Sequence, residues 1–346
     1  MDKNKIKIGI IGFGRMGITH YSIINSHPNV EIVSVADTSK TILSILKKFN
    51  KELNVYTDYK ELIDESKPDA IIISTPPNLH YPIIKYAYER GVHVFCEKPF
   101  TANKQQAEEL TNLFANSNLV NQIGFAARYG DVLNKAKELI DQKVIGDAIR
   151  FKGEMFSCAI IKKTSGTNWR DNEENGGGVV YEMSSHMIDL INYFFGEPDN
   201  VAGTVRNKVF SKNVDDLVST TLIYNNGLVG TLYINWSDES YRKPMISLEV
   251  FGSKGKIIAD FYGYKIFLSK ENKELNLRKG WNTFYLTDVY KPTPFYVRGG
   301  EFTNQLYNFV ELILGNQKTN LCDFAEALKT ERIIDLMFKN SITINN

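Results

Sequence analysis

The sequence predicts an α/β protein whose first third folds as a doubly wound parallel sheet. Short runs of β-branched residues alternate with helical segments through residues 6–125, as expected for strands joined by crossover helices. The chain has 346 residues, of which 43% are apolar, so it can form the cores of two domains. From about residue 146, turn signals separate longer strand-like segments, which indicates a second domain with a different organisation and a boundary near residue 125.

The elements predicted for the first domain follow one another at regular spacing. The isoleucine-rich runs are typical of strands buried on both faces of a parallel sheet. We therefore predict a first domain at 1–125 and a second at 126–346. The expected strands are 6–11, 30–37, 69–75, 91–100 and 119–125; the expected helices are one that ends near residue 26 and those at 40–49, 81–90 and 103–117.

A glycine-rich turn, GFGRMG, follows the first strand. Gly12, Gly14 and Gly17 precede a helix, and Asp37 ends the second predicted strand about 20 residues later. In this context the glycines allow a tight turn, a close approach of the backbone to a pyrophosphate, and close packing of helix and strand. The helix N-terminus also offers N–H groups to phosphate. The sequence therefore predicts a dinucleotide site, with a purely structural glycine turn as the alternative.

The acid at the end of the second strand bears on the choice of dinucleotide. The Asp37 carboxylate can accept hydrogen bonds from the adenosine ribose and repels a 2′-phosphate, which favours NAD over NADP. Because Arg15 can pair with phosphate, NADP stays an alternative to NAD. For Asp37 itself, the alternative is a helix-capping role. The other candidate cofactor contacts in the turn are Phe13, Arg15 and Met16.

Composition and charge argue against several classes of function. The 41 basic and 40 acidic residues leave a net charge of +1, which argues against nucleic acid or an anionic membrane as partner. No apolar run approaches the roughly 20 residues of a spanning helix, and the N-terminus lacks the features of a signal peptide. Cys96, Cys158 and Cys322 are far apart, and the histidines are dispersed. We therefore expect free thiols, no metal site and a cytoplasmic protein.

Four segments, in order along the chain, resemble the glucose–fructose oxidoreductase/inositol dehydrogenase/MocA (Gfo/Idh/MocA) family. The resemblance implies an NAD(P)-dependent oxidoreductase that acts on a sugar, cyclitol or nucleotide sugar. It also implies a Rossmann domain joined to an α/β domain with a large, mostly antiparallel sheet, and a homo-oligomer (dimer or tetramer). EKP is the most specific element. The segments are GFGRMG with the strand before it, STPPNLH (74–80), CEKPF (96–100) and GGGVVYEMSSHMIDL (176–190).

The second domain has the strand pattern that this resemblance implies. Turn signals such as NNG and GSKG separate its strand-like segments, which suggests hairpins and meanders. The expected strands are 147–156, 200–207, 217–224, 228–236 and 245–252, and two helices near 299–315 and 322–340 close the chain.

The lysine of the EKP segment is the first candidate catalytic residue. Lys98 follows a predicted strand at its carboxyl end, where ligands bind in open α/β sheets. Pro99 biases it toward an extended conformation. From spacing alone, a solvated surface lysine is the alternative. The resemblance implies that Lys98 contacts both the substrate hydroxyl and the cofactor, and that Glu97 lies near the nicotinamide ribose.

The segment STPPNLH follows another predicted strand. Its prolines prevent a helix from starting directly after the sheet and shape a loop. The resemblance implies that this loop lines the nicotinamide–ribose pocket, and for the histidine a packing or capping role is the alternative. The candidate residues are Ser74, Thr75, Pro76, Asn78 and His80.

Glu182 and His186 lie four residues apart in a predicted helix, so their Cβ atoms would be roughly 5–6 Å apart on one face. From periodicity alone, a polar surface stripe is the alternative, and Asp189 is expected to be structural. The resemblance implies that this acid–xxx–His pair faces Lys98. His186 can then exchange the substrate proton near neutral pH, while Glu182 orients the imidazole or binds a substrate hydroxyl. Family members usually carry Asp at the position of Glu182.

Further polar residues are candidate substrate contacts. Arg170 can bind a carboxylate or phosphate, with a structural salt bridge as the alternative. The glycines at 176–178 suit a close approach beside the cofactor. The candidate substrate contacts are Arg128, Tyr129, Trp169 and Arg170, and the weaker candidates are Tyr296 and Arg298.

Two functions of other classes stay open. One is a non-catalytic regulator that senses a dinucleotide, which the presence of Lys98 and His186 argues against. The other is an NAD-dependent glycosidase that cycles the hydride internally. An enzyme similar to trans-dihydrodiol dehydrogenase would differ only in its substrate.

Overall fold

A computed structural model describes residues 5–164 and 169–345. The chain forms two compact units. One comprises the chain up to Ala126 together with Thr293–Leu328, and the other comprises Ala127–Pro292 with the chain from Lys329 onward. The boundary expected near residue 125 coincides with the point where the chain first passes from one unit to the other, between Ala126 and Ala127. Residues 293–328, which sequence patterns assign to the second domain, instead belong with the first unit.

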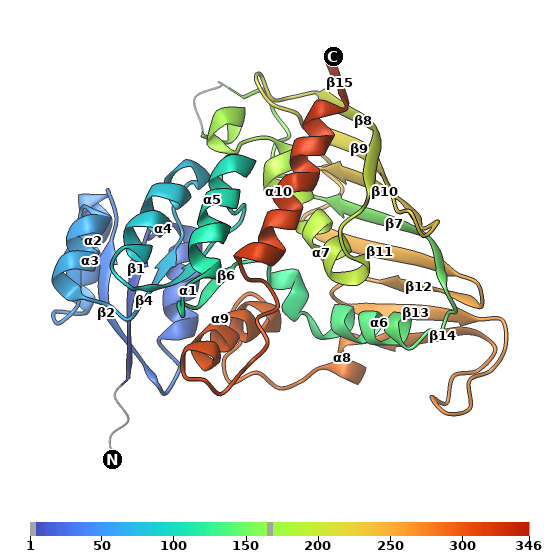
Figure 1. Ribbon diagram of the computed structural model, residues 1–346, viewed down its shortest axis with the longest axis horizontal. Helices are drawn as coiled ribbons and strands as arrows, with labels where there is room; N and C mark the ends of the chain where they lie inside the picture. Colours follow the sequence, from blue (N-terminus) through green and yellow to red (C-terminus); the bar gives the residue numbers. More distant parts are fainter. Residues whose placement is uncertain (1–4, 165–168, 346) are drawn as a thin grey trace. The chain divides into compact units, whose positions relative to one another are not determined.

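The first unit contains a six-stranded parallel sheet in the order β3-β2-β1-β4-β5-β6 (Figure 1). This order is that of a Rossmann sheet, so the predicted doubly wound fold is confirmed. Its strands are β1 (Ile6–Ile11), β2 (Val30–Ala36), β3 (Asn54–Tyr56), β4 (Ala70–Ile73), β5 (His93–Cys96) and β6 (Asn121–Ile123). Its helices are α1 (Arg15–Ile24), α2 (Lys40–Phe49), α3 (Tyr59–Ser66), α4 (His80–Tyr88), α5 (Lys104–Ala115) and α9 (Gly300–Ile313).

Helices cover both faces of this sheet because alternate strand residues enter two separate cores. Ile8 and Ile10 of β1 share a core with side chains of α1, α2 and α9. Ile71 and Ile73 of β4 share the other core with side chains of α3, α4 and α5, and with the start of α10 (Phe324–Lys339). The return of α9 explains why residues 293–328 join this unit: Leu306, Phe309 and Val310 of α9 are buried in the first core.

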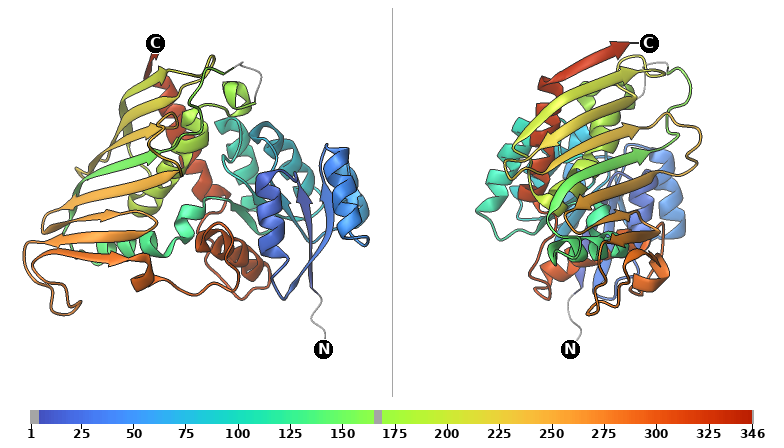
Figure 2. Two further views of the ribbon diagram at one scale, coloured as in Figure 1. Left: turned by 180° about the vertical axis from the view of Figure 1, so that it is seen from behind. Right: turned by 90° about the vertical axis from the view of Figure 1, so that its right-hand side faces the viewer.

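The second unit contains a nine-stranded, mostly antiparallel sheet in the order β14-β13-β12-β11-β7-β10-β9-β8-β15 (Figure 2). Among the strands of the described residues, only the pairs β7/β10 and β8/β15 are parallel. The five predicted strands are present. Its strands are β7 (Ala148–Phe156), β8 (Asn200–Lys208), β9 (Leu217–Ile223), β10 (Val229–Asn235), β11 (Met245–Gly252), β12 (Gly255–Ala259), β13 (Gly263–Leu268), β14 (Gly280–Tyr285) and β15 (Ser341–Asn345).

The two faces of this sheet differ. Side chains of α6 (Asp131–Asp141), α7 (Ser185–Phe195) and the end of α10 pack on one face in a single core, and α8 (Leu286–Val289) packs at its margin. The alternate residues point the other way and leave four large side chains 37–47% exposed. These residues, which we call the open aromatic face, are Tyr233, Phe251, Phe267 and Trp281.

Candidate functional site

The glycine-rich turn has the geometry that a dinucleotide requires. Gly12 has φ of +86°, and a Cβ on it would lie 2.8 Å from the backbone of Ser74. A Cβ on Gly17 would lie 2.1 Å from the carbonyl oxygen of Gly12, whereas one on Gly14 would meet open space. The first and third glycines are therefore needed for packing, and the second leaves room for a ligand to approach the backbone.

The start of α1 suits an anion. Gly14 is its N-cap and provides no side-chain hydrogen bond, and its first turn contains no acidic residue. The first N–H groups of a helix have no partner within the helix, and the helix dipole makes this end positive. A pyrophosphate can satisfy these N–H groups. The hydroxyls of Ser74 and Thr75 are also buried without a hydrogen-bond partner in the described part of the chain, which further fits a bound group.

Asp37 joins the glycine turn to the segment after β2. Its Oδ2 accepts a hydrogen bond from the backbone N–H of Phe13 at 2.7 Å, and its Oδ1 accepts one from that of Ser39 at 2.8 Å. The N-cap of α2 is Ser39, so the alternative role of Asp37 as a helix cap does not apply. Each carboxylate oxygen keeps a second lone pair, which can accept a bond from a ribose hydroxyl.

Replacing Asp37 with serine should weaken NADH binding about tenfold, the effect of losing one charge-assisted hydrogen bond, while NADPH binding stays level or improves. Fluorescence titration of both dinucleotides measures this. Asp58→Ser is the matched control because Asp58 caps α3 in the same unit. An unchanged preference between NADH and NADPH in Asp37→Ser would contradict the assignment of Asp37 to the adenosine ribose.

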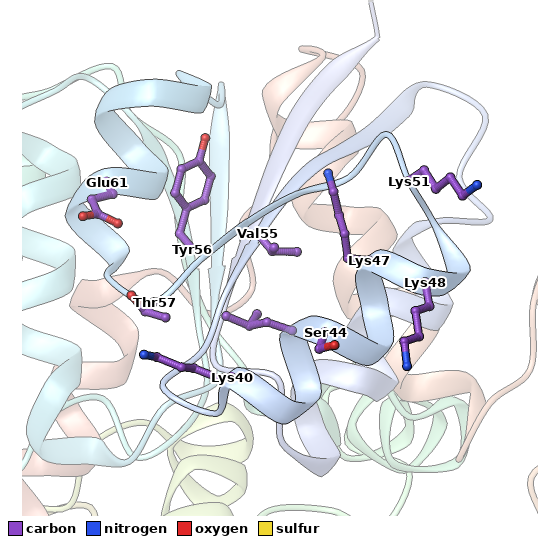
Figure 3. Close-up of a pocket in the computed structure, with 10 residues that line it drawn as sticks. Lys40, Ser44, Lys47, Lys48, Lys51, Val55, Tyr56, Thr57 and Glu61 are labelled. Atoms are coloured by element: carbon purple, nitrogen blue, oxygen red, sulfur yellow. The ribbon is translucent and has the colours of Figure 1, made fainter.

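A basic groove of about 670 Å³ lies between α2 and β3 (Figure 3). It begins at Lys40, three residues beyond Asp37, and the Nζ of Lys47 donates a hydrogen bond to the carbonyl of Leu53 at 2.8 Å. Cations this near the end of β2 keep NADP open as an alternative to NAD. The lining residues are Lys40, Leu43, Ser44, Lys47, Lys48, Lys51, Val55, Tyr56, Thr57 and Glu61.

Glu97 is held in a buried pair with a residue that the sequence analysis did not identify. Its Oε1 lies 2.6 Å from Nε2 of His20 in α1, and its Oε2 accepts a hydrogen bond from the backbone N–H of Lys98 at 3.2 Å. Burial alone would raise the pKa of Glu97, but the hydrogen bond and charge of His20, together with Lys98, lower it overall. The sequence contains no local signal for this pair, because His20 and Glu97 are 77 positions apart. A contact of Glu97 with the nicotinamide ribose stays a prediction.

His80 ties the loop after β4 to the loop after β5. Its ring is fully buried, with Nδ1 2.9 Å from the carbonyl oxygen of Pro99 and Nε2 3.0 Å from that of Thr75. Burial lowers the pKa of His80, although the carbonyl groups oppose this effect. These contacts favour the packing alternative for His80 over a direct contact with the cofactor, while Pro76 and the exposed Asn78 stay candidates.

Lys98 is half-buried directly after β5, in a cis peptide bond with Pro99. The candidate cofactor residues follow the carboxyl ends of β1, β2, β4 and β5, which are neighbours in one parallel sheet (Figure 1). The first unit therefore brings the glycine turn, Asp37, the loop after β4 and Lys98 to one edge, where open α/β sheets bind their ligands.

In the second unit, the predicted helix begins differently from expectation. Val180–Ser184 forms a π-helical turn, and the α-helix α7 begins only at Ser185. Glu182 therefore lies in a wider turn than His186, and the α-helical spacing we expected between them is wrong. The apolar residues of this segment are buried: Met183, Met187, Leu190, Ile191 and Phe194.

Glu182 is paired with Arg170. The Nε of Arg170 lies 3.0 Å and 2.8 Å from the two carboxylate oxygens of Glu182. The salt-bridge alternative for Arg170 is thus present, and it fixes the carboxylate of Glu182. His186 is half-buried on α7. The side chain of Trp169 lies outside the described residues.

Arg128 and Asp189 form a buried ion pair. The Nη2 and Nε of Arg128 lie 2.8–3.1 Å from the Asp189 carboxylate oxygens, and both side chains are at most 2% exposed. This arrangement supports the expected structural role of Asp189. It favours a structural role for Arg128 as well, in place of the expected substrate contact. Tyr129 is also buried, so its substrate contact stays a prediction.

Asp215 supports the glycine segment before the π-helical turn. Gly178 has φ of +93°, and a Cβ there would lie 2.4 Å from Oδ1 of Asp215. The carbonyl oxygen of Asp215 accepts a hydrogen bond from the backbone N–H of Val179. Burial raises the pKa of Asp215 to about 7; the charge of Arg206 opposes this effect, and the charge of Glu173 adds to it. No local sequence pattern points to Asp215, because Gly178 and Val179 lie far from it along the chain.

Asp215→Asn should stabilise the protein at pH 8 and leave its stability near pH 4 unchanged. The native carboxyl stays protonated up to about pH 7, whereas the unfolded one ionises near pH 4, so the parent loses stability between these values. The expected gain at pH 8 is about 4 kcal/mol, since the pKa differs by about three units between the two states; urea unfolding measures it. Asp147→Asn, at an exposed ion pair with Lys143, should show no such gain. An equal effect at both pH values would contradict the prediction.

The described residues contain no cluster of three or more potential metal ligands. Within the same ranges, no helix is long and apolar enough to cross a membrane. The predicted free thiols are confirmed for Cys96, Cys158 and Cys322. Lys98 belongs to the first unit, whereas Glu182 and His186 belong to the second, so their meeting at one site stays a prediction.

Solved structures with the same fold include a levoglucosan dehydrogenase in complex with NADH and levoglucosan. It has a TM-score of 0.86 and 21% identity over 97% of both chains. Such a likeness supports the fold of both units.

Curated relatives include enzymes named for sugar and cyclitol substrates. A levoglucosan dehydrogenase of Pseudarthrobacter phenanthrenivorans is 25% identical, over 74% of each chain. The scyllo-inositol 2-dehydrogenase (NAD+) of Bacillus subtilis is 26% identical, again over 74% of each. An uncharacterized oxidoreductase of Schizosaccharomyces pombe is 32% identical over 59% of this chain, which spans only 55% of that relative's length.

Family models match both units. Residues 6–125 match the oxidoreductase family with an NAD-binding Rossmann fold, and residues 133–258 match the Gfo/Idh/MocA C-terminal domain. These two matches cover the glycine turn, Lys98, Glu182 and His186, in the order that the sequence predicts. The chain therefore belongs to the Gfo/Idh/MocA family of oxidoreductases, and its N-terminal domain is an NAD-binding domain.

Proposed function

We propose that this protein is an NAD-dependent dehydrogenase that oxidises a CH–OH group of a sugar, cyclitol or nucleotide sugar, or reduces the corresponding ketone. The observation that carries the proposal is the position of Lys98, directly after β5 at the sheet edge that also carries the glycine turn and Asp37. The names of the levoglucosan and inositol dehydrogenases support the substrate class.

Oxidation of a carbinol requires a group that takes the hydroxyl proton. When NAD is bound, its nicotinamide ring supplies the hydride acceptor. In the proposed mechanism, the Lys98 ammonium donates a hydrogen bond to the substrate oxygen and stabilises the negative charge that develops there. The imidazole of His186 accepts the hydroxyl proton, and in the reverse direction it returns that proton.

Glu182 and Arg170 are proposed to act as a pair. The ion pair between them holds the Glu182 carboxylate at a fixed position beside the turn that leads to His186. From there it can accept a hydrogen bond from the imidazole or from a second substrate hydroxyl. In this proposal the longer side chain of glutamate, compared with the family's usual aspartate, reaches across the wider π-helical turn.

A homo-oligomer is part of the proposal. The open aromatic face presents four large side chains on one side of a nine-stranded sheet, and exposed apolar surfaces of this kind are typical of contacts between proteins. Light scattering coupled to size-exclusion chromatography would measure the mass of the assembly.

The experiment that tests the function is a screen by NADH fluorescence. The protein is incubated with NAD+ and a panel of polyols, free sugars, sugar phosphates and nucleotide sugars. Net NADH formation with one class supports the dehydrogenase. Release of a free sugar from a glycoside without net NADH would favour the glycosidase, and NADH binding without turnover of any class would favour the regulator.

A further inference from the structure

The segment that leads into α9 brings a cation to the glycine-rich turn. Arg298 lies in Thr293–Leu328, the stretch that returns to the first unit. Phe295 and Val297 pack against the core that also contains side chains of α1 and α9. This packing fixes the segment on the unit and leaves Tyr296 and Arg298 exposed between the packed residues and α9.

The polar contact of the Arg298 guanidinium is a weak one. Its Nη1 lies 3.2 Å from Sδ of Met16, which is in the first turn of α1. Its Cζ lies 5.2 Å from the ring centroid of Phe302. A thioether is a poor acceptor for a charged donor. Neither Arg298 nor Arg15 forms an ion pair with a carboxylate in the described ranges of the chain.

The surroundings of Arg298 are unfavourable for an isolated cation. Partial burial, and then repulsion by Arg15, lower the pKa of Arg298, while Glu97 and Glu301 oppose this effect. Its backbone has φ of +69°, a left-handed conformation that is strained for any residue other than glycine. Such conformations persist where the surrounding structure fixes them, and they concentrate at functional sites.

These features share one explanation. The N-terminus of α1 and two arginines converge on the glycine turn, whose expected ligand carries two negative charges on its pyrophosphate. We infer that Arg298 binds the pyrophosphate of NAD, where it exchanges its contact with the Met16 thioether for one with a phosphate oxygen. Guanidinium groups are well suited to phosphate because their planar array of N–H donors can form two parallel hydrogen bonds. The inference concerns cofactor binding and holds whatever the substrate is.

The test compares ligands with and without a pyrophosphate. Arg298→Leu should weaken binding of NADH and of ADP-ribose about tenfold each, as expected for loss of a hydrogen bond to a charged group. Binding of adenosine, which has no phosphate, should stay unchanged. The dissociation constants come from fluorescence titration for NADH and from competition with NADH for the other two ligands. Arg298→Lys should recover part of the loss because it keeps the charge.

Two further variants separate binding from folding. Lys318→Leu removes one positive charge from an exposed loop of the same unit and should bind NADH as the parent does. Arg298→Gly removes the left-handed strain, so its melting temperature without ligand should equal or exceed that of the parent, while the rise that NADH causes should shrink. Parent-like binding of NADH by both Arg298→Leu and Arg298→Gly would overturn the inference. So would a loss of adenosine affinity as large as the loss for NADH.

Discussion

Lys98→Ala should lower kcat about a thousandfold, within the range found for removal of a donor that stabilises charge in the transition state, while the dissociation constant for NADH changes little. The reason is that other elements at the same edge of the sheet are expected to hold most of the nucleotide: the glycine turn, Asp37 and the loop after β4. The substrate oxygen would lose its charged hydrogen-bond donor in the transition state. Steady-state kinetics with the substrate found by the screen, together with NADH titration, measure the two effects separately.

Two variants serve as controls for Lys98. Lys60→Ala removes an exposed lysine from α3 of the same unit and should leave kcat unchanged. Lys98→Arg keeps a positive charge but titrates only at a much higher pH. Partial activity of Lys98→Arg would assign Lys98 an electrostatic role, whereas none would point to proton transfer or to exact positioning. Near-normal turnover of Lys98→Ala would refute the catalytic assignment.

His186→Asn should also lower kcat about a thousandfold, because asparagine cannot exchange a proton as imidazole does. In the parent, oxidation requires the neutral imidazole, so its rate should fall as the pH drops through the pKa of His186. Reduction requires the protonated ring, so its rate should fall as the pH rises. Both pH dependences should disappear in His186→Asn. Rate profiles in the two directions, from about pH 5 to pH 9, measure this.

The matched control for His186 is His27→Asn. His27 lies in the first unit beside Glu311, with its Nε2 3.4 Å from Oε1 of Glu311, and has no assigned part in the reaction. This variant should keep both pH profiles. If His186→Asn retained near-parent rates with an unchanged profile, the proton would have to pass through another group, and the proposed mechanism would fail.

Local sequence patterns predicted the strands whose side chains show a regular pattern of burial. A strand that is buried on both faces is apolar throughout, as in the isoleucine runs of β1 and β4. A strand that is buried on one face alternates between apolar and polar residues, as in β9 and β10. The strand β3 has only three residues, which is too short for such a pattern. The edge strand β15 carries the exposed side chains Ile342 and Ile344, so its sequence lacks the hydrophobic pattern of a buried strand.

The site was predicted best where its residues are neighbours along the chain. The roles of Gly12, Gly14 and Gly17 depend on local turn geometry, which a short motif encodes. The π-helical turn at Val180–Ser184 has no comparable sequence signature. The segment before it packs at Gly178 against Asp215, a residue that is distant along the chain. The pair of His20 and Glu97 joins residues 77 positions apart, and no local pattern announces such a contact.

The return of residues 293–328 to the first unit means that the two units are interleaved along the chain, since neither is one continuous stretch. A gene fragment that stops at residue 126 would lack α9, and the apolar surface that covers Leu306, Phe309 and Val310 would face water. Exchange of the nucleotide-binding unit with that of a relative would therefore need two replaced stretches and three junctions, at 126/127, 292/293 and 328/329. Recombination at one crossover point would divide a hydrophobic core between two parents.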